Sequence, residues 1–351
     1  MKKKIYLHVG THKTGSTAIQ RTLESHKVGL QNENVGLLRL PNNELYHKLM
    51  YFTEVDNAAS QKIRNSLLRQ ISEHNNCKSF ILSYELFSGN PNTLYSNQEV
   101  VLEIIKNALY DFELELIVFF RRQDEFIQSL YMQLIHEGKD ISIDVFLQMP
   151  STKIDYLNFI DGLIKVFGES KLNVFPYDSK VLTNRDIIQL FNLPIKSKTL
   201  EQLESKNINV GFSSHGKELF ERLRKDLTRE GSRHLRFLIQ ENSNKGVLNE
   251  YNILSYAQKK NFLERFEKTN AILAERFWLE RFDLKNFSSI NKSDCTMSKK
   301  EANKELSDVI ITKLLSDVKK KASKEVNIEP TKEELLKIFI RKIKRKVNGG
   351  R

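Results

Sequence analysis

The sequence of 351 residues contains only two cysteines, Cys77 and Cys295, together with six prolines and 14 glycines. Two cysteines exclude a disulfide scaffold and a structural zinc site built from cysteines. The low proline and glycine content excludes collagen-like and low-complexity chains. No apolar run approaches the roughly 18 residues that a transmembrane helix needs, and residues 5–10 are too short and polar for a secretory signal. These absences predict a globular protein of the cytosol.

Basic residues outnumber acidic residues by 56 to 44, which gives a net charge of +12. Residues 291–351 hold 17 Lys or Arg and 9 Asp or Glu, so this tail carries +8 and leaves +4 for residues 1–290. The mildly basic body fits one anionic ligand and no nucleic-acid partner. The tail is either a solvated helical segment or a contact with an acidic surface, such as a membrane leaflet, a polyanionic glycan or nucleic acid.

Short β-forming segments alternate with helical patterns in the first half of the chain. We expect strands at 4–9, 35–40, 79–83, 114–120 and 172–176, and helices at 16–26, 58–75, 100–110 and 125–136. This alternation predicts an α/β fold with a mostly parallel central sheet and helices on both faces. Further helical patterns cover 185–191, 214–227 and 255–282. We predict one domain over residues 1–287, followed by a linker and a basic helical tail (with helices at 301–322 and 332–347) over 288–351.

The strongest motif is G-T-H-K-T-G-S-T, which runs from Gly10 to Thr17 between the first strand and the first helix. Gly10 and Gly15 have the spacing of a Walker A loop, but a Walker A loop has lysine directly after its second glycine. Here Ser16 occupies that position, and the lysine is Lys13 in mid-loop. The backbone amides of such a loop and the helix N-terminus bind phosphate. The motif is therefore either an anion site or an ordinary strand-to-helix turn.

A second motif, R-R-Q-D-E-F-I-Q-S-L-Y, follows the strand at 114–120. Arg121 and Ser129 are eight residues apart, so a helix that begins near Asp124 places Ser129 about a turn and a half along. Both side chains then converge on one tetrahedral anion, with Arg122 as a second candidate. The alternative is a solvated arginine pair and a surface serine.

Together the two motifs resemble the sulfotransferases that use 3′-phosphoadenosine 5′-phosphosulfate (PAPS). The run Lys13-Thr14-Gly15-Ser16-Thr17 matches the family's 5′-phosphosulfate loop, and Arg121, Ser129 and Tyr131 match its 3′-phosphate motif. Animal cytosolic members have Trp where this chain has Ala18, and the motifs look more like the bacterial branch. The resemblance implies a P-loop-like sulfotransferase fold, and the matched motifs lie within residues 4–177.

The resemblance implies a role for each matched residue. Lys13 contacts the bridging oxygen of the phosphosulfate and stabilises charge on the leaving phosphate. The 5′-phosphate is held by Thr14, Gly15, Ser16 and Thr17. Arg121 and Ser129 hold the 3′-phosphate, while Tyr177, in L-N-V-F-P-Y-D, lies near the adenine.

The expected general base is Glu85, in S-Y-E-L-F directly after the strand at 79–83. Ligands of parallel sheets bind at the carboxyl ends of the strands, and the family places its His or Glu base past this strand. A carboxylate there accepts the proton of an acceptor hydroxyl. His12, inside the loop, is the rival base, and a capping or solvated role is the alternative for Glu85. We expect His8, in a central strand, to be a buried structural histidine.

The resemblance thus implies a sulfotransferase with PAPS as co-substrate, no metal, and a hydroxyl or amine acceptor on a carbohydrate or glycolipid. A P-loop nucleotide kinase or phosphotransferase is the first alternative, against which Ser16 in the Walker lysine position argues. A non-catalytic nucleotide-binding or scaffold protein, with the basic tail as its working part, is the second.

Overall fold

The computed structural model describes residues 2–40, 43–136, 141–148, 154–177, 188–189, 191–196, 229–242 and 254–278, with 220, 223 and 227 singly. The chain divides into two compact units. The first unit comprises Met1–Leu130, Asp144–Asn209 and Lys259–Ser289. The second comprises Tyr131–Ile143, Val210–Gln258 and Ile290–Arg351. All of the site residues expected from the sequence belong to the first unit.

Five strands form one sheet in the first unit, in the order β2-β3-β1-β4-β5. Their bounds are β1 Lys4–His8, β2 Val35–Leu38, β3 Ser79–Ser83, β4 Glu113–Arg121 and β5 Leu172–Tyr177. Every pair is parallel, and His8 of β1 lies opposite Ser83 of β3 and Ile117 of β4. The predicted α/β class and parallel sheet are confirmed. Because β1 lies between β3 and β4, the carboxyl ends of these three strands adjoin.

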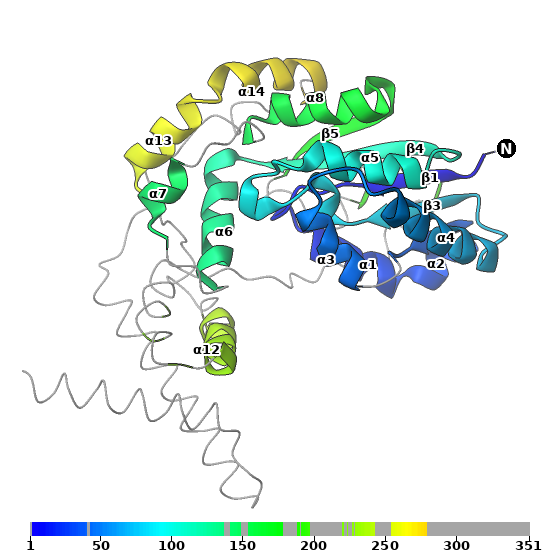
Figure 1. The fold of residues 1–351 in the computed structure, drawn as a ribbon, viewed down its shortest axis with the longest axis horizontal. Coiled ribbons are helices and arrows are strands. Elements are labelled where there is room, and N and C mark those ends of the chain that lie inside the picture. The colour runs from blue at the N-terminus through cyan, green and yellow to red at the C-terminus, as the bar shows by residue number, and fades with distance from the viewer. Residues whose placement is uncertain are drawn as a thin grey trace, which may run out of the picture. The chain divides into compact units, whose positions relative to one another are not determined.

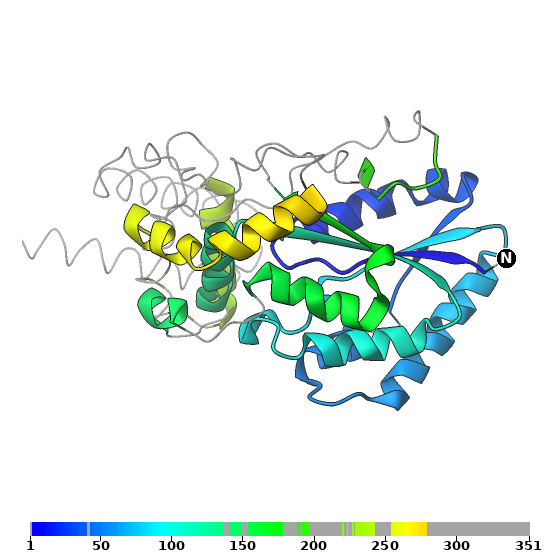
Figure 2. The same cartoon turned by 90° about the horizontal axis from the view of Figure 1, so that it is seen from above.

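Helices cover both faces of the sheet (Figures 1 and 2). One face carries α1 Ser16–Ser25 and α2 Lys27–Asn32, and the other carries α4 Asn57–Glu73, α5 Gln98–Ala108 and α8 Tyr156–Phe167. Successive side chains of β4 point to opposite faces of the sheet, so the strand packs against helices on both sides. Phe119 shares a buried cluster with Ile19 of α1, whereas the next residue, Phe120, stacks on Tyr156 of α8 with ring centroids 4.1 Å apart. With both faces covered, the strands are continuous apolar runs.

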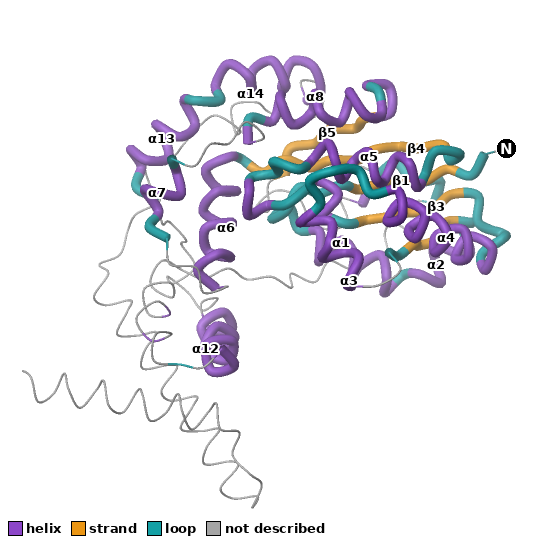
Figure 3. The backbone as a smooth tube through the Cα atoms, in the orientation of Figure 1, coloured by secondary structure: helices purple, strands orange, loops and turns teal. Residues whose placement is uncertain are grey.

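The remaining elements are shown in Figure 3. The helices are α3 Asn43–Lys48, α6 Gln123–His136, α7 Ile143–Leu147, α12 Arg229–Asn242, α13 Tyr256–Glu264, α14 Glu267–Leu273 and a π-helical turn at Ala274–Trp278. Short 3₁₀ turns occur at Leu49–Tyr51, Glu85–Ser88, Pro91–Thr93 and Glu169–Lys171. Within the described ranges, no helix is long and apolar enough to cross a membrane.

The structure differs from the sequence predictions in one helix that is broken and in five helices that were not predicted, α2, α3, α7, α8 and α12. The single helix expected at 255–282 is broken between α13 and α14, where the Phe266 amide donates to the Leu263 carbonyl (2.9 Å) and closes a tight turn. Helix α8 was not predicted; its N-cap is Asp155, whose side chain accepts from the Leu157 amide (3.0 Å). The linker and the tail helices lie outside the described residues, as do most of 185–191 and 214–227, and the boundary at 287 stays a prediction.

Candidate functional site

The loop after β1 is held against β4 by its backbone. The Thr11 amide donates to the Phe119 carbonyl (3.0 Å), and the His12 amide donates to the hydroxyl of Tyr95 (3.1 Å). The Thr14 hydroxyl donates to the Thr11 carbonyl across the turn (2.6 Å). Lys13, at the apex, has a φ of 66°, in the left-handed region that non-glycine residues seldom adopt. Residues held in such conformations cluster at ligand-binding and catalytic sites.

The start of α1 provides donors for an anion. Gly15 caps the helix with a φ of 77°, and its carbonyl accepts from the amides of Ala18 and Ile19 (2.9 and 3.0 Å). The amides of Ser16 and Thr17 come before these and have no acceptor within the helix. Ser16 is 6% exposed, and among the described residues its Oγ has no hydrogen-bond partner. A buried, unsatisfied hydroxyl beside a helix N-terminus fits a bound phosphate oxygen.

Glu85 lies directly against the first glycine of the loop. A Cβ on Gly10 would be 3.1 Å from the Cα of Glu85. The Glu85 carboxylate accepts a hydrogen bond from Gln20 of α1 (Nε2 to Oε2, 3.1 Å), and the same Nε2 donates to the Ser83 carbonyl (3.0 Å). Helix α1 therefore supplies both the free N-terminal amides after the loop and a donor to the carboxylate.

His8 and His12 are both buried, and burial lowers the pKa of each ring to about 3. For His12 the positive charge of Lys13 adds to this effect. The Nδ1 of His8 is hydrogen-bonded to the Ser83 hydroxyl (2.7 Å). Both rings are thus neutral near pH 7. The expectation that His8 is buried is confirmed, and the lowered pKa of His12 makes its ring a weak base.

The two adjacent arginines have different partners. Arg122 makes a bidentate ion pair with Asp124, which is fully buried (Nε to Oδ1 2.6 Å, Nη2 to Oδ2 3.1 Å), and its Nη2 lies 3.5 Å from Glu125 Oε1. Arg121 donates through Nε to the other oxygen of Glu125 (3.0 Å) and through Nη1 to the Lys13 carbonyl (3.5 Å). Arg121 therefore reaches the loop, while Arg122 is engaged by a buried carboxylate.

Two further predicted residues lie near Arg121. Ser129 is half-buried and follows Glu125 by four residues on α6, so it shares a helix face with the carboxylate that binds Arg121. Tyr177 ends β5 opposite Arg121, and a Cβ on Gly15 would be 3.0 Å from its hydroxyl. The loop, Arg121 and Tyr177 are therefore neighbours at one edge of the sheet. What each residue binds stays a prediction.

Gln20 and Tyr95 were not singled out from the sequence. Gln20 follows Ser16 by four residues, so the helical period places both on one face of α1, and this is a signal that the sequence contains. Tyr95 has no such signal, because its contact with His12 spans 83 residues. In the described part of the chain, no three His, Cys, Asp or Glu side chains are grouped to hold a metal ion.

No protein-family model matches the chain, and no curated protein sequence does so either. Among solved structures, the chain is similar to the crystal structure of a sulfotransferase from Alicyclobacillus acidocaldarius. The identity is 14% and the TM-score is 0.37, over 65% of this chain and 94% of that chain. A similarity of this size does not establish the function of this chain.

Proposed function

We propose that this protein is a sulfotransferase that moves a sulfuryl group from PAPS to a hydroxyl or amine of an acceptor, on a carbohydrate or glycolipid. The observation that carries the proposal is the contact between the anion-binding loop and Glu85. A phosphate cradle with a mid-loop lysine lies against the backbone of a residue that bears a carboxylate, since a Cβ on Gly10 would be 3.1 Å from the Cα of Glu85. That juxtaposition serves transfer to an acceptor hydroxyl, which needs charge stabilisation on one side and a base on the other.

Some of these residues bind the nucleotide, and the others act on the transferred group and the acceptor. The amides and hydroxyls of Ser16 and Thr17 hold the 5′-phosphate, and Arg121 with Ser129 holds the 3′-phosphate. The acceptor oxygen forms a bond to sulfur, and the bond between sulfur and the bridging phosphate oxygen breaks, with its electron pair leaving on that oxygen. Lys13 stabilises the charge that grows there. Glu85 accepts the hydroxyl proton.

Nucleotide selectivity tests the binding half of the proposal. A charge-assisted hydrogen bond contributes about 1.5–3 kcal/mol, so 3′-phosphoadenosine 5′-phosphate (PAP) should bind roughly tenfold or more tightly than AMP or ATP. Isothermal titration calorimetry measures all three. Equal affinity for AMP would contradict the assignment of Arg121, and Mg²⁺-dependent ATP turnover would favour the phosphotransferase alternative.

Glu85→Gln tests the catalytic half. In assays with radiolabelled PAPS and a cell extract as the acceptor source, turnover should fall about 10²–10⁴-fold, the usual contribution of a positioned base. The affinity for PAP should not change, because Glu85 acts on the acceptor side. Glu73→Gln, on the exposed surface of α4, is the matched control and should keep full activity. Full activity in Glu85→Gln would move the base to His12 or to the acceptor.

A further inference from the structure

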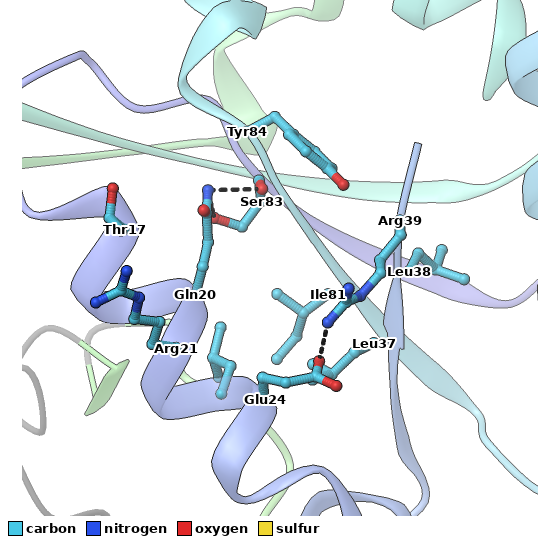
Figure 4. Close-up of a pocket in the computed structure, with 11 residues that line it drawn as sticks. Thr17, Gln20, Arg21, Glu24, Leu37, Leu38, Arg39, Ile81, Ser83 and Tyr84 are labelled. Atoms are coloured by element: carbon cyan, nitrogen blue, oxygen red, sulfur yellow. Dashed lines mark hydrogen bonds and ion pairs between the residues drawn. The ribbon is translucent and has the colours of Figure 1, made fainter. Parts of the chain in front are cut away.

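A cavity of about 310 Å³ lies between α1, β2 and β3 of the first unit (Figure 4). Its volume is at the lower end of the range of about 300–1,000 Å³ that is typical of small-molecule sites. Its inner wall is apolar and includes Leu23, Leu37 and Ile81. Leu23 and Ile81 are almost fully buried, whereas Glu24 and Arg39, which also line the cavity, are exposed. The cavity is therefore an open pocket with an apolar floor and a polar rim.

The polar rim offers hydrogen-bonding groups of three kinds. Arg39 and Glu24 form an ion pair (Nη2 to Oε2, 2.6 Å), which raises the pKa of Arg39 and keeps the guanidinium charged. Burial raises the pKa of Tyr84, whose hydroxyl accepts from the Leu40 amide (3.2 Å) and stays protonated. A guanidinium donates, a carboxylate accepts and a phenol does both. Such a rim around an apolar floor suits a ring with one C–H face and several hydroxyl groups, which describes a pyranose.

Gln20 connects this pocket to the proposed base. Its side chain lines the cavity while its Nε2 donates to Glu85 Oε2 (3.1 Å) and to the Ser83 carbonyl (3.0 Å). Thr17, which belongs to the phosphate loop, lines the same cavity one turn earlier on α1. The pocket thus extends from the loop that is proposed to hold the phosphosulfate to the exposed rim. A ring bound there would contact Thr17 of the loop and Gln20, the residue that donates to Glu85.

We propose that this pocket is the acceptor subsite, that it binds one pyranoside ring, and that Gln20 is a positioning residue that holds the Glu85 carboxylate toward the ring. The proposal rests on the proposed function. In the transfer, the ring hydroxyl oxygen bonds to sulfur, its proton passes to Glu85, and the bond from sulfur to the bridging phosphate oxygen breaks. That oxygen keeps the electron pair.

The location is tested by filling the pocket. The probes are the methyl glycosides of glucose, galactose, mannose and N-acetylglucosamine, assayed with radiolabelled PAPS. Leu37→Trp should raise the KM of the labelled glycoside about tenfold or more, by occupying the ring's place, and should leave the Kd of PAP within about twofold. Leu68→Trp, at an exposed leucine of α4, is the matched control and should change neither value.

The role of Gln20 is tested by Gln20→Ala. The variant should lower kcat about tenfold or more and leave the KM of PAPS unchanged, because the carboxylate is no longer held in place. Gln20→Lys keeps a donor for the carboxylate and should recover part of the lost kcat. No recovery in a Gln20→Lys variant that still binds PAP would overturn the positioning role.

The remaining outcomes distinguish failure of the acceptor subsite from failure of the proposed sulfotransferase function. If Leu37→Trp does not bind PAP it is misfolded, and Arg39→Ala on the exposed rim replaces it, with the same expected rise in KM. An unchanged KM in the folded variants overturns the location. Label on extract components but on none of the glycosides overturns the pyranoside class. Failure of the wild-type protein to label the extract or any glycoside overturns the proposed function, and the subsite with it.

Discussion

Lys13 lies at the apex of the loop with a left-handed backbone; burial lowers the pKa of His12, and the charge of Lys13 adds to that effect. In the proposed reaction, negative charge grows on the bridging oxygen only as the bond to sulfur breaks, so Lys13 stabilises the transition state more than the ground state. Lys13→Ala should therefore lower kcat about 10²–10³-fold and leave the Kd of PAP nearly unchanged. Transfer at saturating PAPS and calorimetry measure the two effects. Lys62→Ala, at an exposed position of α4, is the control. Near-normal turnover in Lys13→Ala would mean that the loop binds the nucleotide but takes no part in the transfer step.

Arg121 and Arg122 are adjacent in sequence, but replacing one should weaken nucleotide binding, whereas replacing the other should lower stability. Arg121→Ala should weaken PAP binding about tenfold or more, through the loss of a charge-assisted contact, and leave AMP binding unchanged. Arg122→Ala should instead lower the free energy of unfolding, by up to about 3–5 kcal/mol, because buried Asp124 loses its partner. Calorimetry with both nucleotides and urea unfolding separate these results. A loss of PAP affinity in a stably folded Arg122→Ala would exchange the two assignments.

The phosphate loop as an element depends on Gly15. Its φ is 77°, and a Cβ there would also lie 3.0 Å from the hydroxyl of Tyr177. Gly168, after α8, also has a positive φ of 83°, with a ψ of 152° in place of 13° and open space where its Cβ would be, so it is the control for a positive-φ glycine outside the loop. Alanine at either position should cost about 1–3 kcal/mol in unfolding free energy from backbone strain. Only Gly15→Ala should also weaken PAP binding, as measured by calorimetry; equal affinities in the two variants would show that the loop does not bind the nucleotide.

The strands were predictable because both faces of the sheet are covered, so each strand is a short apolar run such as S-F-I-L-S in β3. Helix α8 was not predictable, because its local sequence does not favour a helix. It is rich in aromatic and β-branched residues and contains Gly162, which have low intrinsic helix propensity. Its helical structure depends on tertiary packing, including the stack of Tyr156 on Phe120.

The same limit applies to the candidate site. Because carboxyl ends of parallel strands share an edge, the sequence was enough to place Lys13, Glu85 and Arg121 together. Contacts between distant segments were not predictable. The hydrogen bond from Gln20 to Glu85 spans 65 residues. The different partners of Arg121 and Arg122 depend on which guanidinium lies beside the buried carboxylate of Asp124. The pocket beside β2 likewise needs the strand order β2-β3-β1, which local patterns do not contain.

For the whole molecule, the buried histidines should make stability depend on pH. His8 and His12 have a folded-state pKa of about 3, against about 6.5 when unfolded. The unfolded chain therefore binds protons first as the pH falls, so the stability that is present above pH 6.5 is lost progressively toward pH 3. Each histidine contributes a slope of at most about 1.4 kcal/mol per pH unit.

Urea unfolding between pH 7.5 and 5.5 measures this slope before most carboxylates titrate. The wild-type free energy of unfolding should fall with pH, and His8→Asn should show a smaller fall, because its amide can still bond to the Ser83 hydroxyl without taking up a proton. His47→Asn, at an exposed position, should keep the wild-type slope. Equal slopes in His8→Asn and the wild-type protein would mean that the His8 ring gains its proton in the folded state, and that the centre of the sheet is accessible to water.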